Sequence, residues 1–259
     1  MKKFIAMLLA LTMVLAFAAC AKTEQPAETT AAPETTAAIE TTVAVETEAA
    51  ETADVMTYAE YAAIEVAEGD LVPVVVECYV QATQSWWDNS IVVYAADAEG
   101  AYFIYGMACS EEDSAKLVPG TKIRVSGDKV VWSGEYEIMN GTFEFVEDGE
   151  TYVAEALDVT ELLGTDELID HQNEFVAFNG MTVEAIEYKN GEPGDDIYVT
   201  LGYNGASYSF CVEVYLTGTD SDVYTTVGEL EVGDVVNVEG YLYWYEGVNP
   251  HITAISVAE

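Results

Sequence analysis

Two segments of the chain repeat one pattern of glycines and hydrophobic residues at a distance of 113 positions. Each copy holds a leucine, two glycines and a tryptophan in the same order: Leu117, Gly120, Gly127 and Trp132 in the first, and Leu230, Gly233, Gly240 and Trp244 in the second. Between the two glycines, hydrophobic residues recur at every second position, which is the period of a half-buried β-strand. Solenoid repeats are only roughly 20–50 residues long, so this spacing predicts a duplicated domain.

Residues 1–20 have the features of an export signal. Lys2 and Lys3 precede a predominantly apolar run at 4–17, which is shorter than a membrane-spanning helix requires. The run ends in Phe17-Ala18-Ala19-Cys20, which resembles the cleavage box of bacterial lipoproteins. The resemblance implies a signal peptide at 1–19 and a lipid group on Cys20. An ordinary signal peptide cut after Ala19 is the alternative.

Residues 20–54 are predicted to form a stalk behind the lipidated cysteine. The segment is mostly Ala, Thr, Glu and Pro, it has no aromatic residue, and Lys22 is its only base. Such a composition buries too little apolar surface to offset the entropy of ordering it, so we expect disorder. Its mean reach is about 30–35 Å, enough to hold a domain away from a bilayer.

The remaining residues suit two domains of about 100 each, and both are acidic. Residues 55–164 carry 21 acidic against 4 basic side chains, residues 165–259 carry 18 against 1, and the whole chain has a net charge of −39. Nucleic acids, anionic headgroups and teichoic acids are disfavoured, because binding phosphates requires Lys and Arg. Cations, neutral glycans and basic peptides remain compatible with this charge.

Three cysteines follow Cys20, namely Cys78, Cys109 and Cys211. Three thiols allow one bridge at most, so the chain is not a disulfide scaffold. Buried small hydrophobic residues are the first interpretation, and a Cys78–Cys109 bridge is the alternative. No metal-ligand spacing is present in the sequence, and we expect no cofactor.

The same order of elements is predicted in both halves. The capping box from Thr57 to Glu60 and the cap at Ser110 indicate short helices. Strands are expected in the first half at 73–81, 91–95, 102–107, 121–131 and 136–139, with a hairpin at Asn140-Gly141 and further extended segments at 143–146 and 152–156. The second half is expected to have strands at 175–186 with a bulge at Gly180, 197–201, 208–216, 235–240 and 252–257, with a helix at 220–227.

Three strands, a helix and two strands are the order of an OB-fold, a five-stranded Greek-key barrel. We therefore predict an all-β chain with short helices, in which two tandem OB-fold barrels, 55–163 and 164–259, follow the stalk. The chain resembles tandem OB-fold surface lipoproteins of Gram-positive anaerobes over roughly residues 56–259. The motifs that carry this resemblance lie at 84–89, 107–113 and 243–251.

OB-folds bind ligands on strands two and three, between the loops that join strands one to two and four to five. All four tryptophans fall in such loops. The predicted ligand-binding residues are Trp86, Trp87, Asp88, Asn89 and Trp132 in the first barrel, and Tyr188, Trp244, Tyr245, Asn249 and His251 in the second. Aromatic faces beside Asp and Asn suit sugar recognition. The alternative for Trp132 and Trp244 is that they plug the barrel ends. Trp86 and Trp87 are neighbours in extended chain and cannot both face inward.

Catalysis is not expected. The sequence has two histidines and lacks a serine elbow, a phosphate loop and a His/Cys metal spacing. Asp195 and Asp196 are an acidic pair of a kind that is common by chance in so acidic a chain. Residues 219–222 lack the glycine and the distal glutamate of an EF-hand, so a helix cap is favoured there over calcium.

These observations predict a non-catalytic, membrane-anchored binding or scaffold lipoprotein at the cell surface. Its expected ligand is a neutral glycan or a protein. Oligonucleotide binding by analogy with other OB-folds is the first alternative, and a carboxylate-dependent hydrolase is the second.

Overall fold

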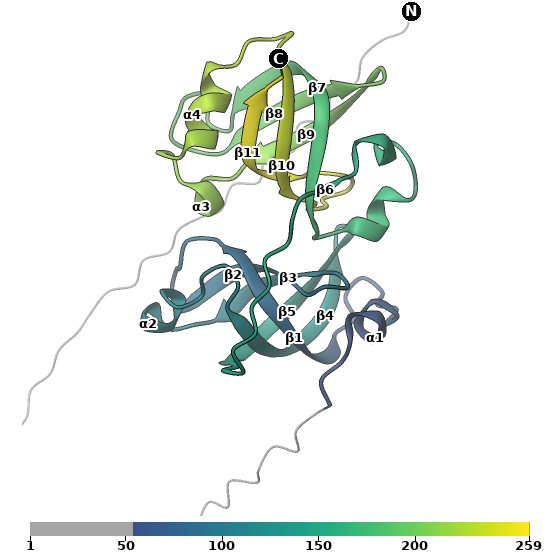
Figure 1. Cartoon of the computed structure of the whole chain (residues 1–259), viewed down its shortest axis with the longest axis vertical. Helices are drawn as coiled ribbons and strands as arrows, with labels where there is room; N and C mark the ends of the chain where they lie inside the picture. Colours follow the sequence, from purple (N-terminus) through teal and green to yellow (C-terminus); the bar gives the residue numbers. More distant parts are fainter. Residues whose placement is uncertain (1–53, 259) are drawn as a thin grey trace, which may run out of the picture. The chain divides into compact units, whose positions relative to one another are not determined.

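The computed structural model describes residues 54–258 (Figure 1). The predicted signal peptide, Cys20 and the stalk up to residue 53 lie outside the described residues. Within 54–258, no helix combines the length and the apolar character that crossing a membrane requires.

The first half is a closed five-stranded barrel with strand order β1-β2-β3-β5-β4. Its elements are α1 (Tyr58–Ala62), β1 (Val72–Thr83), β2 (Ser90–Ala96), β3 (Ala101–Ala108), α2 (Glu111–Ser114), β4 (Lys122–Trp132) and β5 (Glu135–Phe145). The antiparallel pairing of β1 with β4 closes the barrel, and β3 pairs with β5 in parallel. Alternate residues of β1 are buried inside, among them Val74, Val76 and Cys78.

The second half has the equivalent order β7-β8-β9-β11-β10, and β10 pairs back onto β7. Its elements are β6 (Leu157–Asp158), η1 (Thr160–Leu162), η2 (Leu168–His171), β7 (Phe175–Tyr188), β8 (Ile197–Tyr203), β9 (Ala206–Val212), α3 (Val214–Thr217), α4 (Asp222–Glu229), β10 (Val235–Tyr241) and β11 (His251–Val257). The short β6 adds to β7 in parallel. Both halves therefore have the OB-fold order, with helix between the third and fourth strands, and the predicted fold class is confirmed.

The repeated glycines occupy equivalent turns ahead of the fourth strands. Gly120 has φ +89° and Gly233 has φ +102°, which is the left-handed region that favours glycine. The Gly120 amide donates to the Val80 carbonyl at 2.8 Å, and the Gly233 amide donates to the Val183 carbonyl at the same distance. The sequence repeat thus corresponds to the same glycine turn, hydrogen-bonded to the first strand, in each half.

The predicted hairpin at Asn140-Gly141 is wrong, because β5 runs through it without a break. The pair instead forms an irregularity between β4 and β5, where Asn140 has φ +54° and its side-chain amide donates to Asp128 at 2.8 Å. A residue pair that tolerates left-handed backbone suits a bulge as well as a turn. The extended segment predicted at 152–156 is also wrong, since these residues are in no strand. The bulge predicted at Gly180 is confirmed by its φ of +67° and a register shift opposite it.

The strand predicted at 208–216 ends early, at Val212. The following residues turn into α3, whose first amide, that of Val214, donates to the Asp196 carboxylate at 2.9 Å. Gly218 ends this helix with φ +81°. The side chain of Asp196 is distant in sequence, so the local pattern of hydrophobic residues does not reveal the change.

Three hydrophobic clusters organise the described residues. One fills each barrel, and a third lies between the two barrels, around Tyr94, Phe103 and Tyr241. Cys78, Cys109 and Cys211 are free and buried, so the alternative bridge between Cys78 and Cys109 is not formed.

Candidate functional site between the two barrels

The loop from β1 to β2 is fixed at both ends by hydrogen bonds. The Gln84 amide donates to the Val92 carbonyl at 3.0 Å, and Trp87 and Ser90 exchange backbone hydrogen bonds at 3.0 and 2.9 Å. Between Trp87 and Ser90, Asp88 and Asn89 have φ of +46° and +61°, so they form a tight turn with both residues exposed.

The two neighbouring tryptophans of this loop have opposite environments. Trp86 packs against the hydrophobic core of the first barrel, and its indole N–H donates to the Cys109 carbonyl at 2.8 Å. The side chain of Trp87 is 78% exposed. Only one of the two rings therefore faces the barrel, as strand geometry requires.

The same loop is joined to α3 of the second barrel. The Ser85 amide donates to the Tyr215 carbonyl at 2.7 Å, and the Ser85 hydroxyl donates to the same carbonyl at 3.3 Å. The side-chain amide of Gln84 donates to the Glu213 carboxylate at 2.7 Å. These bonds bring the β1–β2 loop of one barrel against a short helix of the other.

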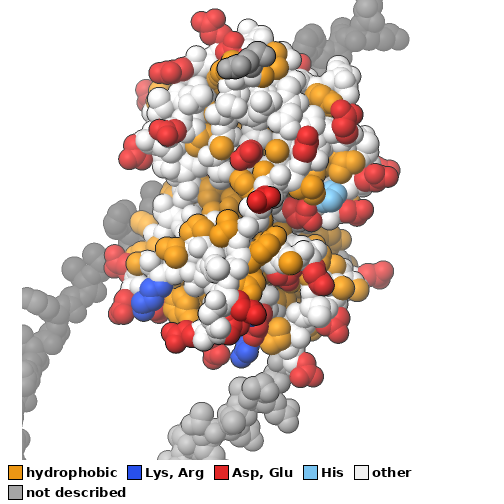
Figure 2. Space-filling view, viewed as in Figure 1, with side chains coloured by type: hydrophobic (Ala, Val, Ile, Leu, Met, Phe, Trp, Pro, Cys, Tyr) orange, Lys and Arg blue, Asp and Glu red, His pale blue; other side chains and the backbone are white. Residues whose placement is uncertain are grey.

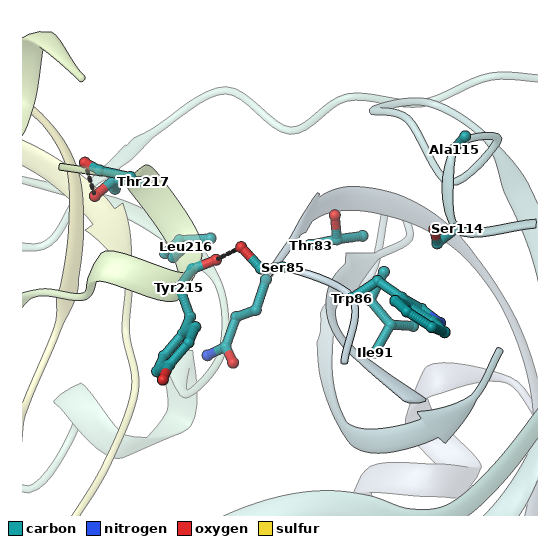
Figure 3. A pocket seen from close by; sticks show the side chains of 11 residues that line it. Thr83, Ser85, Trp86, Ile91, Ser114, Ala115, Tyr215, Leu216 and Thr217 are labelled. Carbon is teal, nitrogen blue, oxygen red and sulfur yellow. Dashed lines mark hydrogen bonds between the residues drawn. The ribbon is translucent and has the colours of Figure 1, made fainter. Parts of the chain in front are cut away.

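A cleft of about 390 Å³ opens between these two segments. In Figure 3, Tyr215, Leu216 and Thr217 lie on one side of it and Trp86 on the other. It is lined by Thr83, Gln84, Ser85, Trp86, Ile91, Ser114, Ala115, Tyr215, Leu216, Thr217 and Gly218. None of these residues carries a charge, in a chain of net charge −39. The lining combines hydroxyl groups, an amide and two aromatic rings, and the volume is within the usual range of small-molecule sites. The Gln84 amide and the hydroxyls of Ser85, Ser114 and Thr217 already donate hydrogen bonds within the protein, so the oxygens of these groups are what they present as acceptors.

The predicted residues of the fourth-to-fifth-strand loops meet one another away from this cleft. The rings of Trp132 and Tyr245 are about half exposed, with centroids 5.2 Å apart. Trp244 packs against the core of the second barrel. Asn249 uses its backbone amide to reach the Tyr243 carbonyl at 3.0 Å. The plug interpretation thus fits Trp244, while Trp132 faces solvent.

Two further predicted residues are used inside the fold. Tyr188 packs against the second core and lies 6.4 Å from Tyr224, measured between ring centroids. His251 is buried, and its Nδ1 lies 2.6 Å from the Tyr94 hydroxyl and 3.2 Å from the Glu213 carboxylate. His251 therefore joins the two barrels and does not line the cleft.

The acidic pair Asp195 and Asp196 is also engaged in contacts within the fold. Asp196 is buried, accepts from the Val214 amide, and pairs with Lys189 at 2.8 Å. The adjacent Asp195 accepts from the Asp196 amide at 2.9 Å. Ser221 caps α4 by accepting from the Tyr224 amide, which matches the helix cap expected there. Among residues 54–258, no group of three or more His, Cys, Asp or Glu side chains is arranged to hold a metal.

Two other carboxylates are buried where the barrels meet. Glu135 and Glu137 lie two positions apart on β5, and Glu135 accepts from the Trp244 amide at 2.8 Å. Burial raises the pKa of Glu137 to about 7 and holds the pKa of Glu135 well above its ordinary value. The other carboxylate oxygen of Glu135 and the side-chain oxygen of Asn173 have no hydrogen-bond partner. Neither glutamate lines the cleft.

Every basic side chain in the described part of the chain already has partners. Lys116, Lys122, Arg124 and Lys189 pair with carboxylates, and Lys129 is 3% exposed with its ammonium on the Tyr61 and Ile64 carbonyls. A phosphate backbone would have to displace these carboxylates to gain a cationic contact.

Sequence reasoning missed the α3 side of the cleft. Tyr215 and Leu216 fell within a predicted strand, Thr217 followed that strand directly, and Ser114 fell in a helix that was assigned no role. The pair Thr217-Gly218 is a helix-stop signal that points to a break there. The position of α3 against Ser85 has no counterpart in the local sequence, because the two residues are 130 positions apart.

No family model matches the chain, and no curated protein matches its sequence. Solved structures with similarity include the p204 HINb domain (TM-score 0.36, 14% identity, 73% of this chain and 100% of that one). Another is p202 HIN1 in complex with 12-mer dsDNA, with a TM-score of 0.36 and 12% identity over 75% of this chain and 98% of that one. A deletion mutant of the single-stranded DNA-binding protein from Thermus aquaticus has a TM-score of 0.25 and 12% identity over 74% of this chain and 96% of that one. At these scores, none of them indicates what this chain binds.

Separate substitutions of the two loop tryptophans should have unequal effects on stability. Trp86→Ala removes core packing and a hydrogen bond to Cys109, and we expect the free energy of unfolding to fall by about 3 kcal/mol. Trp87→Ala removes an exposed ring and should change it by less than about 1 kcal/mol. Urea denaturation followed by circular dichroism measures both. Equal losses would contradict the opposite environments of the two rings.

Stability should also depend on the ionisation of Glu137. Its pKa is raised from 4.5 to about 7 in the fold, so the folded state holds the proton more tightly than the unfolded state. Stability is therefore lost as the pH rises from about 4.5 to 7. Glu137→Gln should remove this loss. As the pH rises from 5 to 8, we expect the free energy of unfolding of the variant to increase by about 2 kcal/mol relative to that of wild type.

Urea denaturation across this pH range measures the difference between Glu137→Gln and wild type. Glu144→Gln, at an 80% exposed side chain on the same strand, is the matched control. If the two variants differed from wild type by the same amount at every pH, Glu137 would not titrate with a raised pKa.

Proposed function

We propose that this chain is a non-catalytic, lipid-anchored binding protein that holds a neutral glycan in the cleft between its barrels. The absence of charge from the lining of that cleft carries the proposal. Among the described residues, the cleft sets hydroxyl groups and an amide beside the rings of Trp86 and Tyr215. Apolar ring faces combined with hydroxyl and amide groups match the alternating C–H and O–H surfaces of a sugar.

The surface charge supports a neutral ligand over an anionic one. With a net charge of −39, the chain repels phosphates and carboxylated polymers at long range. An uncharged sugar experiences no such repulsion. A basic peptide is attracted to the surface as a whole, but the cleft has no carboxylate among its lining residues to pair with it.

An oligonucleotide is the alternative ligand that an OB-fold suggests. In the first barrel, the outer sides of β2 and β3 carry Tyr94 and Phe103, which are buried against the second barrel. This is the face on which OB-folds hold nucleic acids. With the paired basic side chains, its burial favours the glycan over the oligonucleotide.

The proposed location of the protein, anchored at the cell surface, rests on its sequence. Cys20 in its cleavage box supports a lipid anchor on an exported protein, and the acidic stalk supports a domain held away from the membrane. A protein partner of the scaffold type remains compatible with this location.

Binding should depend on the exposed tyrosine of the cleft. Tyr215 is 60% exposed, and its contact with Ser85 uses only its backbone oxygen, so Tyr215→Ala should fold normally. We expect affinity for neutral glycans to fall about ten-fold, since an aromatic contact of this kind contributes about 1 kcal/mol beyond its buried area. A glycan array followed by calorimetry measures it.

Tyr105→Ala, at a 51% exposed tyrosine outside the cleft lining, is the control for this experiment. Single-stranded and double-stranded oligonucleotides form a second arm of the same experiment. Oligonucleotide binding that strengthens as salt is lowered, with no glycan bound, would replace the proposed function by the alternative.

The anchor is tested in cells by Cys20→Ser. Without the thiol, no lipid can be attached at this position, so we expect the protein to leave the membrane fraction as a soluble or unprocessed form. Fractionation with detection of the C-terminal barrel measures this. A mature Cys20→Ser protein that stays in the membrane fraction would exclude lipidation of Cys20 as the anchor.

A further inference from the structure

A second cleft, of about 430 Å³, lies between the same two barrels. It is lined by Gln81, Ala82, Pro119, Val153, Ala154, Phe175, Leu216, Thr217, Ser221, Asp222, Val223, Tyr241 and Thr253. These residues come from β1, the α2–β4 loop and the 146–156 segment on one side, and from α3, α4 with its N-cap Ser221, β7, β10 and β11 on the other.

This second cleft is mainly apolar. Eight of its lining residues are hydrophobic, and Asp222 is the only one with a charge. Three of the polar side chains already have partners. The Gln81 side-chain amide donates to the Tyr152 carbonyl at 3.1 Å and accepts from the Ala154 backbone amide at 2.8 Å. The Thr217 hydroxyl donates to the Glu213 carbonyl at 3.1 Å, and the Ser221 hydroxyl donates to the Gly218 carbonyl at 2.9 Å. Figure 2 shows hydrophobic side chains gathered across the middle of the face that it presents.

The polar and apolar clefts meet at α3. Leu216 and Thr217 line both of them. The helix is only four residues long, and Gly218 ends it. A molecule that lies in the first cleft therefore contacts two residues that also line the second.

We propose that the ligand is an amphiphile, with a neutral sugar in the first cleft and an uncharged alkyl or acyl group in the second. This inference rests on the proposed function and specifies its ligand class. The sugar contacts Trp86 and Tyr215, and the apolar group passes Leu216 to lie against Val153 and Phe175. A phosphorylated headgroup is disfavoured, because no basic side chain lines either cleft.

The test compares methyl and hexyl β-glycosides of glucose, galactose and N-acetylglucosamine by calorimetry. The protein is the full-length chain. Burial of one methylene group raises affinity about four-fold, at ~0.8 kcal/mol per group. The hexyl form of the sugar that binds should therefore bind at least ten-fold more tightly than its methyl form. Hexanol alone should bind far more weakly than the hexyl glycoside.

Val153→Asp locates the alkyl group. Val153 is 57% exposed and lines only the apolar cleft, so a charge there should remove the gain from the hexyl chain and leave methyl glycoside affinity unchanged. Val118→Asp, at a 54% exposed valine that lines neither cleft, should change neither affinity.

Equal affinities for the methyl and hexyl forms would overturn the amphiphile and leave the glycan proposal in place. Hexyl binding that Val153→Asp does not weaken, or hexanol binding as tight as that of the glycoside, would also overturn it. Failure of every methyl and hexyl glycoside to bind would count against the proposed function itself.

Discussion

The stacked pair of Tyr94 and Tyr241 is the contact on which the arrangement of residues 54–258 depends. Their ring centroids are 4.4 Å apart at an interplanar angle of 24°, and both side chains are buried. Phe103 packs beside Tyr94 at 5.1 Å, and Phe175 lies 5.3 Å from Tyr241. An aromatic side chain buries about 150–250 Å² when it leaves water, so separating the barrels would expose a large apolar surface on each. This contact makes two barrels of one repeated fold into a single compact unit.

Hydrogen bonds then fix how the barrels meet. The turn between β4 and β5 presents its backbone to the segment before β7, where the Gln172 side chain donates to the Gly134 carbonyl at 2.9 Å and accepts from the Tyr136 amide at 2.9 Å. The Asn173 side chain donates to the Tyr136 carbonyl at 3.0 Å. Such bonds are directional, whereas aromatic burial alone tolerates sliding. The buried carboxyl of Glu135 opposes this association when it is ionised, because a desolvated charge is costly.

The same association sets where a ligand can lie. It covers the outer face of β2 and β3, the place where a lone OB-fold binds its ligand, and it brings the β1–β2 loop against α3. The resulting clefts exist only because two barrels meet. Their lining is almost free of charge, although the chain as a whole is strongly acidic, and this contrast is the main physical reason for proposing a neutral ligand.

The sequence by itself determined the class of the fold, the order of its strands and the equivalence of the two halves. Alternation of hydrophobic residues and glycine turns are local properties, so Gly120 and Gly233 could be matched without coordinates. It also identified Trp86 and Trp87 as a pair that cannot both be buried. Only the tertiary structure decided that Trp86 lines a cleft, that His251 is an interface residue, and that Tyr215 belongs to the site. These outcomes rest on contacts between residues more than 100 positions apart, such as Ser85 with Tyr215 and Tyr94 with His251. A local pattern carries no information about which distant surface will cover it, and that covering surface is what makes the candidate site.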